Sequence, residues 1–171
     1  QKIAERHSLK VVYDAAHAFD IKHKDQSVLN YGDISTLSFH ATKLFHTIEG
    51  GALIIKDDEL ANKARSLINF GINNTGGVSD LGVNAKMNEF EAAMGLCVLD
   101  DMKFILEKRK AAYNNYDQAL SGLLQLQEKN NNSSNNYTYF PIVLENEDRL
   151  LSIVQKLNKM QIFPRRYFRP S

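Results

Sequence analysis

Two short apolar runs enclose a polar stretch that holds one lysine and ends in a pair of glycines. The first run, residues 34–39, predicts a strand, and the second, residues 51–56, predicts the next strand. Lys43 lies between them, shortly after the first strand ends. A lysine in that place can be partly desolvated, which lowers the pKa of its amine and makes it a candidate for imine formation with a carbonyl compound. The alternative is that Lys43 is one of many surface lysines.

Asp14 follows a second strand-like run in the same way. Residues 9–13 predict a strand that ends directly before this carboxylate. An acid at the carboxyl end of such a strand points into the crevice where open α/β sheets bind ligands. Together, Lys43 and Asp14 indicate pyridoxal 5'-phosphate: the lysine would hold the aldehyde, and the carboxylate would keep the pyridine nitrogen protonated, so that the ring can accept electrons. The alternative for Asp14 is a helix N-cap after the strand.

Four stretches of the chain occur together in one order. They are Asp14-Ala15-Ala16-His17, Ser38-Phe39-His40-Ala41-Thr42-Lys43, Glu49-Gly50-Gly51 and Gly82-Val83-Asn84-Ala85-Lys86-Met87-Asn88-Glu89. In this combination the chain resembles the DegT–StrS family of nucleotide-sugar aminotransferases, and the resemblance covers essentially its whole length. It implies an α/β fold of fold type I, dependent on pyridoxal phosphate and similar to aspartate aminotransferase. The expected parts are a portion of the large domain's three-layer α/β/α sheet and a portion of a small C-terminal α+β domain.

The resemblance also implies roles for the residues around the cofactor ring. Lys43 would carry the cofactor and, once the amino donor displaces it, would move a proton as general base and acid. Relatives that deoxygenate sugars have histidine at this position, so a lysine favours transamination. Asp14 would pair with the protonated ring nitrogen as a buried carboxylate. His17 would lie near the ring and its phenolic oxygen, or alternatively would be a structural turn residue.

Two further polar residues would contact the cofactor phosphate. Ser38 would bind it through its hydroxyl and adjacent backbone N–H groups, although a serine at a strand end can instead bond its own backbone. Asn84 would reach the phosphate in the neighbouring subunit, which implies a homodimer with shared active sites. Without the resemblance, Asn84 is interpreted as the turn residue before a long helix. Gly50 and Gly51 would allow close approach and unusual dihedral angles beside the lysine.

The last residues of the chain carry arginines and aromatic side chains. Residues 164–170 resemble a family segment near the nucleotide-sugar site, and Arg166 and Tyr167 are the candidates there for binding a pyrophosphate and a base or sugar face. Arg169 stands where relatives often have an aromatic residue, which leaves the identity of the sugar open. The alternative is a basic, solvated tail.

Composition limits the other classes of function. The 171 residues are 43% hydrophobic and 24% charged with a formal net charge of +1, which gives no electrostatic case for nucleic acid or an anionic membrane. No run approaches the roughly 20 apolar residues of a membrane span. The five histidines and one cysteine show no metal-ligand spacing, so no metal is expected. Cys97 lies in an apolar helical pattern and is expected to be buried. A single cysteine forms no internal disulfide, which fits a reducing compartment and a cytoplasmic protein.

Three regions are expected along the chain. Residues 1–86 would be the second half of the cofactor-binding large domain, residues 87–128 a long interdomain helical region, and residues 129–171 part of the small domain. The chain begins in a helical pattern without a methionine, so we expect a fragment that lacks its amino-terminal part. Such a fragment alone could be inactive even if its parent is an enzyme.

Periodicity and turn residues predict the remaining elements. In chain order these are a short hairpin within 19–29, a helix at 57–70 capped by Gly71, a mobile loop at 72–82, a helical stretch at 88–124 that bends or breaks, an unpacked linker or hairpin tip at 130–136, a strand at 137–144, a helix at 147–160 and a strand at 162–167. The strands at 34–39 and 51–56 are expected to be buried on both faces, as in a parallel or mixed sheet.

The resulting hypothesis is an enzyme that transfers an amino group from glutamate to a nucleotide-linked keto-deoxysugar for polysaccharide or glycan synthesis. The competing hypothesis is a non-catalytic relative that acts as a binding or regulatory module.

Overall fold

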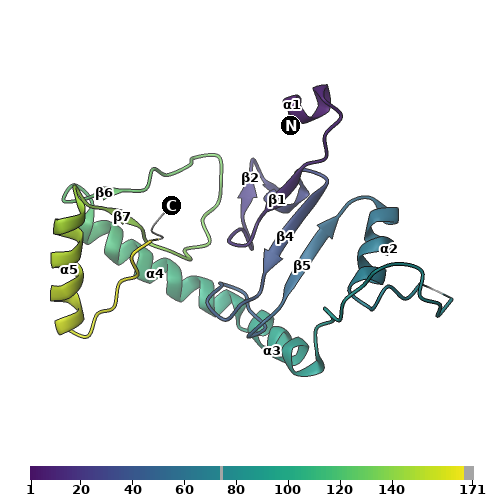
Figure 1. The fold of residues 1–171 in the computed structure, drawn as a ribbon. Helices are drawn as coiled ribbons and strands as arrows, with labels where there is room; N and C mark the ends of the chain where they lie inside the picture. Colours follow the sequence, from purple (N-terminus) through teal and green to yellow (C-terminus); the bar gives the residue numbers. More distant parts are fainter. Residues whose placement is uncertain (74, 168–171) are drawn as a thin grey trace. The chain divides into compact units, whose positions relative to one another are not determined.

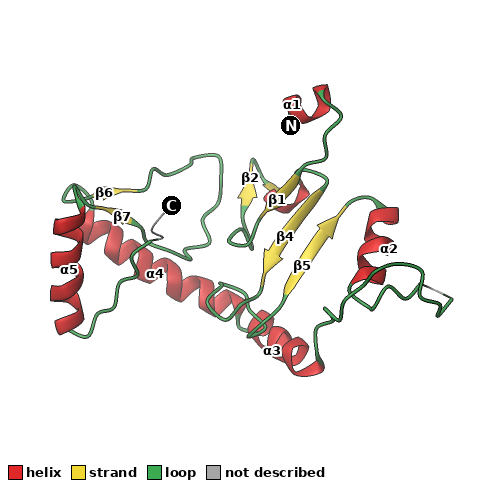
Figure 2. Cartoon of the chain, in the orientation of Figure 1, coloured by secondary structure: helices red, strands yellow, loops and turns green. Residues whose placement is uncertain are grey.

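The computed structural model of the protein describes residues 1–73 and 75–167, and it contains both helices and strands (Figures 1 and 2). In chain order the elements are α1 Lys2–Arg6, β1 Val12–Asp14, β2 Lys22–His23, β3 Gln26–Ser27, the short 3-10 helix Val28–Asn30, β4 Ile34–Ser38, β5 Gly51–Ile55, α2 Asp58–Leu67, α3 Glu89–Asp100, α4 Met102–Leu120, β6 Gln125–Leu126, β7 Ile142–Val143 and α5 Glu147–Lys159.

A three-stranded mixed sheet positions the predicted site. Its order is β1-β4-β5, with β1 parallel to β4 and β4 antiparallel to β5. Asp14, the last residue of β1, is paired with Thr36, and β4 continues from there to Ser38. Because β1 and β4 run in the same direction, their carboxyl ends lie at one edge of the sheet. The sequence predicted a parallel or a mixed sheet, and the sheet is mixed.

Burial on both faces of the sheet is not found. In β4, Ser35 and Leu37 are buried while Ile34, Thr36 and Ser38 are half-buried, so only one face of the strand is fully covered. In β5, Leu53 is 49% exposed. The apolar composition of these strands was read as two-sided burial, but in the described residues few elements cover this small sheet.

Helix α2 begins where the sequence predicted and ends earlier. Asp57 is its N-cap, and the carboxylate accepts a hydrogen bond of 2.8 Å from the backbone N–H of Leu60. The helix ends at Leu67 with Ile68 as the C-cap, so the prediction that Gly71 caps it is wrong. The chain reverses instead through two residues with positive φ, Phe70 at 59° and Gly71 at 72°. This reversal directs the following segment back along the end of α2.

The long helical stretch breaks into two helices, as the sequence predicted. Asn88 and Glu91 form a reciprocal capping box at the start of α3, with hydrogen bonds of 2.9 and 3.1 Å. Asp101 is the C-cap of α3, and α4 follows directly. Gly95 and Val98 are the buried residues of α3. Cys97 is exposed, so its predicted burial is wrong: it lies about 200° around the helix from Gly95, on the opposite side.

The contacts divide the chain into two compact units. The first comprises Gln1–Ala112 and Asn130–Thr138, and the second comprises Tyr113–Lys129 and the residues from Tyr139 onward. The predicted boundaries at 86 and 128 stay a prediction. The second unit contains the end of α4, the antiparallel pair β6–β7 and α5, which is capped by Asn146. Only Ile142–Val143 forms a strand within the predicted 137–144. The strand predicted at 162–167 is wrong, because in the described residues this exposed segment has no strand to pair with.

The predicted hairpin is confirmed, and an unexpected segment lies against it. Strands β2 and β3 pair in antiparallel fashion. We call residues 130–138 the docking segment. Residues 130–136 of it were predicted to be an unpacked linker or hairpin tip, and this prediction is wrong. The backbone N–H of Lys24 donates to the carbonyl of Asn132 at 2.7 Å, and the N–H of Ser134 donates to the carbonyl of Lys22 at 2.8 Å. The segment is therefore held by a short stretch of β-like pairing to residues more than a hundred positions earlier.

Candidate functional site

The candidate site lies at the edge where β1 and β4 end. Asp14 is the last residue of β1 and is exposed rather than buried as predicted. Its carboxylate accepts a hydrogen bond of 3.1 Å from the backbone N–H of Ala16. In addition, Ala18 donates to the carbonyl of Ala15 at 2.9 Å, so a tight turn follows the strand. The alternative interpretation of Asp14 as a helix N-cap is wrong, since no helix begins here.

The loop that carries Lys43 is closed by backbone hydrogen bonds. Phe39 donates to the carbonyl of Gly50 at 2.8 Å, and Thr47 donates to the carbonyl of Phe39 at 2.9 Å. The backbone N–H of Lys43 itself donates to the carbonyl of His40 at 2.9 Å, and the residue is half-buried. The lysine thus stands on an ordered loop that begins and ends on adjacent strands, rather than on a mobile surface excursion.

Buried apolar side chains within this loop anchor it to the core. Leu44 and Phe45 belong to the small set of buried hydrophobic residues. The ring of Phe45 stacks on Phe19, with ring centroids 4.8 Å apart, and meets Phe39 edge to face at 4.7 Å. Thr47 is only 2% exposed. The residues directly after Lys43 are therefore anchored in the core.

Helix α3 packs against the same loop, and the close approach depends on Gly95. A Cβ atom at Gly95 would lie 2.9 Å from the methyl group of Thr47 and 3.4 Å from the ring of Phe45. Gly50 is required for a second reason: its φ of 147° belongs to glycine, and a Cβ there would meet the Met87 side chain at 2.9 Å. The expected backbone roles of the Glu49-Gly50-Gly51 stretch are confirmed at Gly50.

The charges of Asp14 and Lys43 both act on the pKa of His17. The pKa of His17 is lowered below its usual value of 6.5, and partial desolvation is the largest cause. The positive charge of Lys43 lowers that pKa further, while the negative charge of Asp14 raises it. The side chains of Lys43 and Asp14 therefore each lie within electrostatic range of His17. An amine, an imidazole and a carboxylate gather in this way at the carboxyl-end edge of the sheet.

Ser38 lies at the same edge, as the last residue of β4. Its hydroxyl oxygen accepts a long hydrogen bond of 3.5 Å from the backbone N–H of His40, the local arrangement that the sequence left open. His40, which the sequence did not assign, contacts Thr42 at 2.8 Å through Nδ1 and Glu49 at 3.7 Å through Nε2. These contacts hold the Lys43 loop together from within.

Asn84 lies on a different part of the first unit. Val83 and Ala85 donate backbone hydrogen bonds to the end of α2, at Leu67 and Ile68 respectively. The exposed side chain of Asn84 accepts a hydrogen bond of 2.8 Å from Lys86 Nζ. Asn84 and its two neighbours thus contact the end of α2 and their own segment, rather than Asp14, His17 or Lys43.

Arg166 and Tyr167 belong to the second unit. Arg166 forms an ion pair of 3.0 Å with Glu147 in the first turn of α5. Tyr167 is 62% exposed. Arg169, which bears on sugar specificity, lies outside the described residues. The ion pair shows that Arg166 already has an acidic partner, which a pyrophosphate would have to displace.

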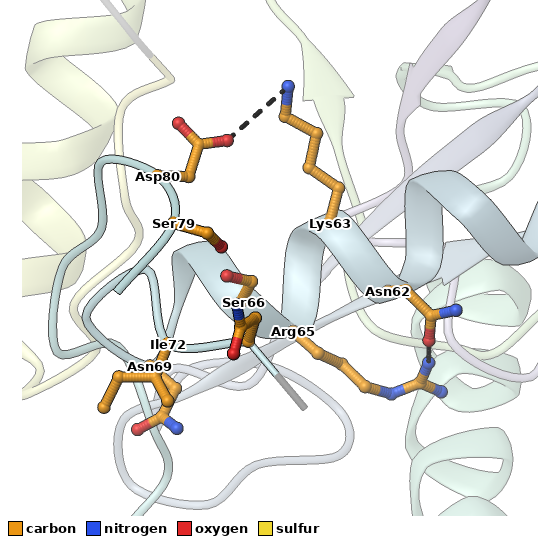
Figure 3. A pocket seen from close by; sticks show the side chains of 9 residues that line it. Asn62, Lys63, Arg65, Ser66, Asn69, Ile72, Ser79 and Asp80 are labelled. Carbon is orange, nitrogen blue, oxygen red and sulfur yellow. Dashed lines mark hydrogen bonds and ion pairs between the residues drawn. The ribbon is translucent and has the colours of Figure 1, made fainter. Parts of the chain in front are cut away.

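In the part of the chain that the structure describes, two of the cavities lie apart from the predicted site residues. One, of about 390 Å³, lies between the end of α2 and the segment after it (Figure 3). In it, Lys63 pairs with Asp80 at 3.8 Å, and the buried hydroxyl of Ser66 has no hydrogen-bond partner. The other, of about 530 Å³, lies beside the first helix and Asp33. Neither is lined by a predicted site residue.

Within residues 1–73 and 75–167, no group of three or more histidine, cysteine or acidic side chains is arranged to hold a metal ion. None of the helices in that part of the chain combines the length and the apolarity that a bilayer crossing requires.

Comparisons with known proteins identify relatives of the whole chain. The dTDP-4-amino-4,6-dideoxy-D-glucose transaminase of Shigella dysenteriae is 41% identical over 98% of this chain and 47% of its own length. The enzyme of the same name from Escherichia coli is 35% identical, over 99% of this chain and 47% of its own length. The chain therefore spans about half the length of these relatives.

Solved structures and a family profile agree with this finding. DesI, crystallised in the presence of its TDP-sugar product, superposes with a TM-score of 0.87 at 32% identity, over 99% of this chain and 45% of that one. PseC of Helicobacter pylori, an aminotransferase of pseudoaminic acid biosynthesis, has a TM-score of 0.85 at 26% identity, over 99% and 48%. These superpositions confirm the predicted α/β fold. The profile of the DegT/DnrJ/EryC1/StrS aminotransferase family matches residues 1–171, so the chain belongs to that family.

Proposed function

We propose that the protein containing this chain is a pyridoxal-phosphate-dependent aminotransferase that acts on a nucleotide-linked keto-deoxysugar in polysaccharide or glycan synthesis. The observation that carries the proposal is the sheet edge where β1 ends at Asp14 and β4 ends at Ser38, with Lys43 on the ordered loop that follows β4. Membership in an aminotransferase family supports it. Since the chain spans about half of its relatives, the proposal concerns the complete gene product.

The side chains at the edge fit pyridoxal phosphate by their chemistry. The group needs a primary amine for its aldehyde, a carboxylate for its ring nitrogen and hydrogen-bond donors for its phosphate. Lys43 offers the amine on an anchored loop, Asp14 the carboxylate and Ser38 a hydroxyl. When bound, the cofactor would supply an electron sink for the carbon that loses a proton. A PLP-form structure of a sugar aminotransferase is among the similar folds.

Each residue then has a definite task. Lys43 would hold the cofactor covalently and, once released by the amino donor, would take up and return a proton at its amine. Asp14, as an ionised carboxylate, would accept the hydrogen bond from the protonated ring nitrogen. His17 carries a lowered pKa and is therefore neutral near pH 7, so that it would contribute a hydrogen bond rather than a second positive charge.

The relatives suggest the substrate class. Both transaminases with 41% and 35% identity are named for dTDP-4-amino-4,6-dideoxy-D-glucose. A transaminase interchanges an amine and a ketone on one carbon, so a dTDP-linked 4-keto-6-deoxyhexose is the first substrate to test. We propose glutamate as the donor, a homodimer in which Asn84 reaches the partner's cofactor phosphate, a nucleotide contact from Arg166 and Tyr167, and a location in the cytoplasm.

The test uses the complete gene product with pyridoxal phosphate and glutamate. A panel of keto-sugar nucleotides is offered, and the aminated product is detected by mass spectrometry. Formation of an aminosugar that is lost in Lys43→Ala, but kept in Lys56→Ala on an exposed site after β5, is the expected result. If no keto-sugar is aminated while the protein folds normally, the non-catalytic hypothesis is favoured instead.

A further inference from the structure

The docking segment reaches the turn that carries His17. In addition to its backbone pairing with the hairpin, the hydroxyl of Ser134 accepts a hydrogen bond of 2.8 Å from the N–H of Lys22. The hydroxyl of Ser133 lies 2.9 Å from Nδ1 of His23. These contacts attach the first part of the segment to residues 22–24. The later part of the segment approaches the chain closer to the end of β1.

Asn136 makes that second attachment. It is 7% exposed, one of three buried polar residues in the described structure. Its Nδ2 donates to the carbonyl of His17 and to the carbonyl of Phe19, both at 3.0 Å. Its Oδ1 accepts from the Thr138 backbone N–H at 3.3 Å and from the Thr138 hydroxyl at 2.8 Å. A primary amide has two donor hydrogens and one carbonyl acceptor with two lone pairs, so its full capacity is used.

The two bound carbonyls lie on both sides of a short turn. His17 and Phe19 are separated by one residue, so the amide of Asn136 binds the turn at two points. The ring of Phe19 then stacks on Phe45, which lies two residues after Lys43 in the same loop, with an interplanar angle of 16°. A chain of direct contacts therefore runs from Asn136 through the turn to the loop of Lys43. Such a fully satisfied buried amide fixes a single geometry, because any other arrangement leaves donors unpaired.

We propose that Asn136 is a positioning residue that holds the turn after β1, so that His17 stands beside Asp14 and Lys43. Its consequence for the cofactor ring rests on the proposed function, but the positioning itself belongs to the cofactor-free protein. Asn136 contacts no reacting group in this account and acts only through the backbone of the turn. The alternative is that Asn136 only attaches the docking segment to the first unit, as Ser134 does, and has no effect on the position of His17.

The experiment titrates His17 in the cofactor-free complete gene product by NMR, with the signal assigned from a His17→Gln variant. Removing the amide in Asn136→Ala frees the turn, so His17 should lose its place near Lys43 and the partial desolvation that lowers its pKa. We expect its pKa to rise toward the ordinary value for histidine, about 6.5. The exposed Asn131 lies in the same segment, and Asn131→Ala should leave the titration of His17 unchanged.

Two more variants separate positioning from simple attachment. Ser134→Ala removes a bond between the segment and the hairpin but leaves every bond of Asn136, so it should lower thermal stability without moving the pKa of His17. Thr138→Val keeps the shape but removes one donor to Asn136, so it should raise the pKa of His17 by less than Asn136→Ala. This variant decides the matter if Asn136→Ala does not fold. An unchanged titration in a folded Asn136→Ala, or an equal shift in Ser134→Ala, would overturn the proposal.

The outcome is independent of whether the protein is an aminotransferase. If the wild-type protein fails to bind pyridoxal phosphate, the proposed function is wrong, and the His17 titration still tests the positioning. If binding occurs and the titration does not respond to Asn136, the positioning alone is wrong. With cofactor bound, Asn136→Ala should also shift the pH midpoint of the visible absorbance band, a change that a purely structural loss would not produce.

Discussion

The ring of Phe45 stacks on the ring of Phe19 with centroids 4.8 Å apart. This one contact joins two stretches that carry different parts of the candidate site. Phe45 follows Lys43 closely in the chain, and Phe19 follows His17. Their packing therefore holds the loop of Lys43 against the turn that follows His17, two stretches that lie far apart in the sequence.

The first prediction concerns this stacking pair. Phe45 is 7% exposed, so Phe45→Ala leaves a cavity beneath the Lys43 loop and should lower the free energy of unfolding by about 3 kcal/mol. Urea denaturation measures the change. Phe104, on α4, is 59% exposed, and Phe104→Ala should cost less than about 1 kcal/mol. Equal losses of unfolding free energy in the two variants would show that the contact of Phe45 with Phe19 does not contribute more to stability than an exposed ring.

The second prediction concerns the charges around His17. Lys43 lowers the pKa of His17, so Lys43→Gln should raise it; Asp14 raises the pKa, so Asp14→Asn should lower it further. NMR titration of the cofactor-free protein measures both. Lys56→Gln, on the exposed residue after β5, serves as the control and should have no effect. A titration that ignores both substitutions would mean that the three groups do not share one environment.

A pH dependence of stability follows from the same shift. The folded protein holds His17 with a lowered pKa, while the unfolded chain has an ordinary value of about 6.5. The unfolded state therefore binds the proton more readily, and the stability contributed by neutral His17 is complete above the unfolded pKa and is lost as pH falls through the folded one. Compared with the wild type, His17→Gln should lose less stability between neutral pH and pH 5. Parallel thermal melts across that range would detect the difference, and identical slopes would contradict it.

The fourth prediction concerns the packing of α3 on the Lys43 loop. In Gly95→Ala, the new methyl group would meet the Thr47 side chain at 2.9 Å, and Thr47 is too deeply buried to move freely. The overpacking costs about 1–3 kcal/mol, against a gain in helix propensity of about 1 kcal/mol, so a net destabilisation is expected. Gly77→Ala is the matched control, because its Cβ would lie 3.7 Å from the nearest atoms. A Gly95→Ala protein as stable as the wild type would refute the tight contact.

Local patterns in the sequence were sufficient to predict the elements around the candidate site. The run before Ser38 and the glycine pair before Leu53 predicted β4 and β5, and Asp57 predicted the start of α2. These features depend on short-range rules: apolar runs, turn residues and caps. Lys43 and Asp14 were singled out by their places after predicted strands, whereas the other site residues came from the family resemblance, and the roles of all of them stay predictions.

Each failed prediction depended on a packing or pairing partner elsewhere in the fold, which a local sequence pattern does not show. Asn136 lies in an Asn/Ser-rich run that was interpreted as unpacked, yet its amide pairs with backbone carbonyls more than a hundred residues away. Backbone carbonyls have no sequence signature, so no local pattern could reveal this partner. The predicted strand at 162–167 failed for the converse reason, because composition cannot tell whether a neighbouring strand is present. Cys97 was misjudged because an apolar helix of nearly uniform hydrophobicity does not show which side faces the core.

The most direct test of the account is to identify the residue that binds the cofactor. The complete gene product is mixed with pyridoxal phosphate, reduced with borohydride, digested and analysed by mass spectrometry. The account predicts a phosphopyridoxyl group on Lys43 and the loss of the visible absorbance band in Lys43→Ala. A label on another lysine, or an absorbance band that survives in Lys43→Ala, would contradict it.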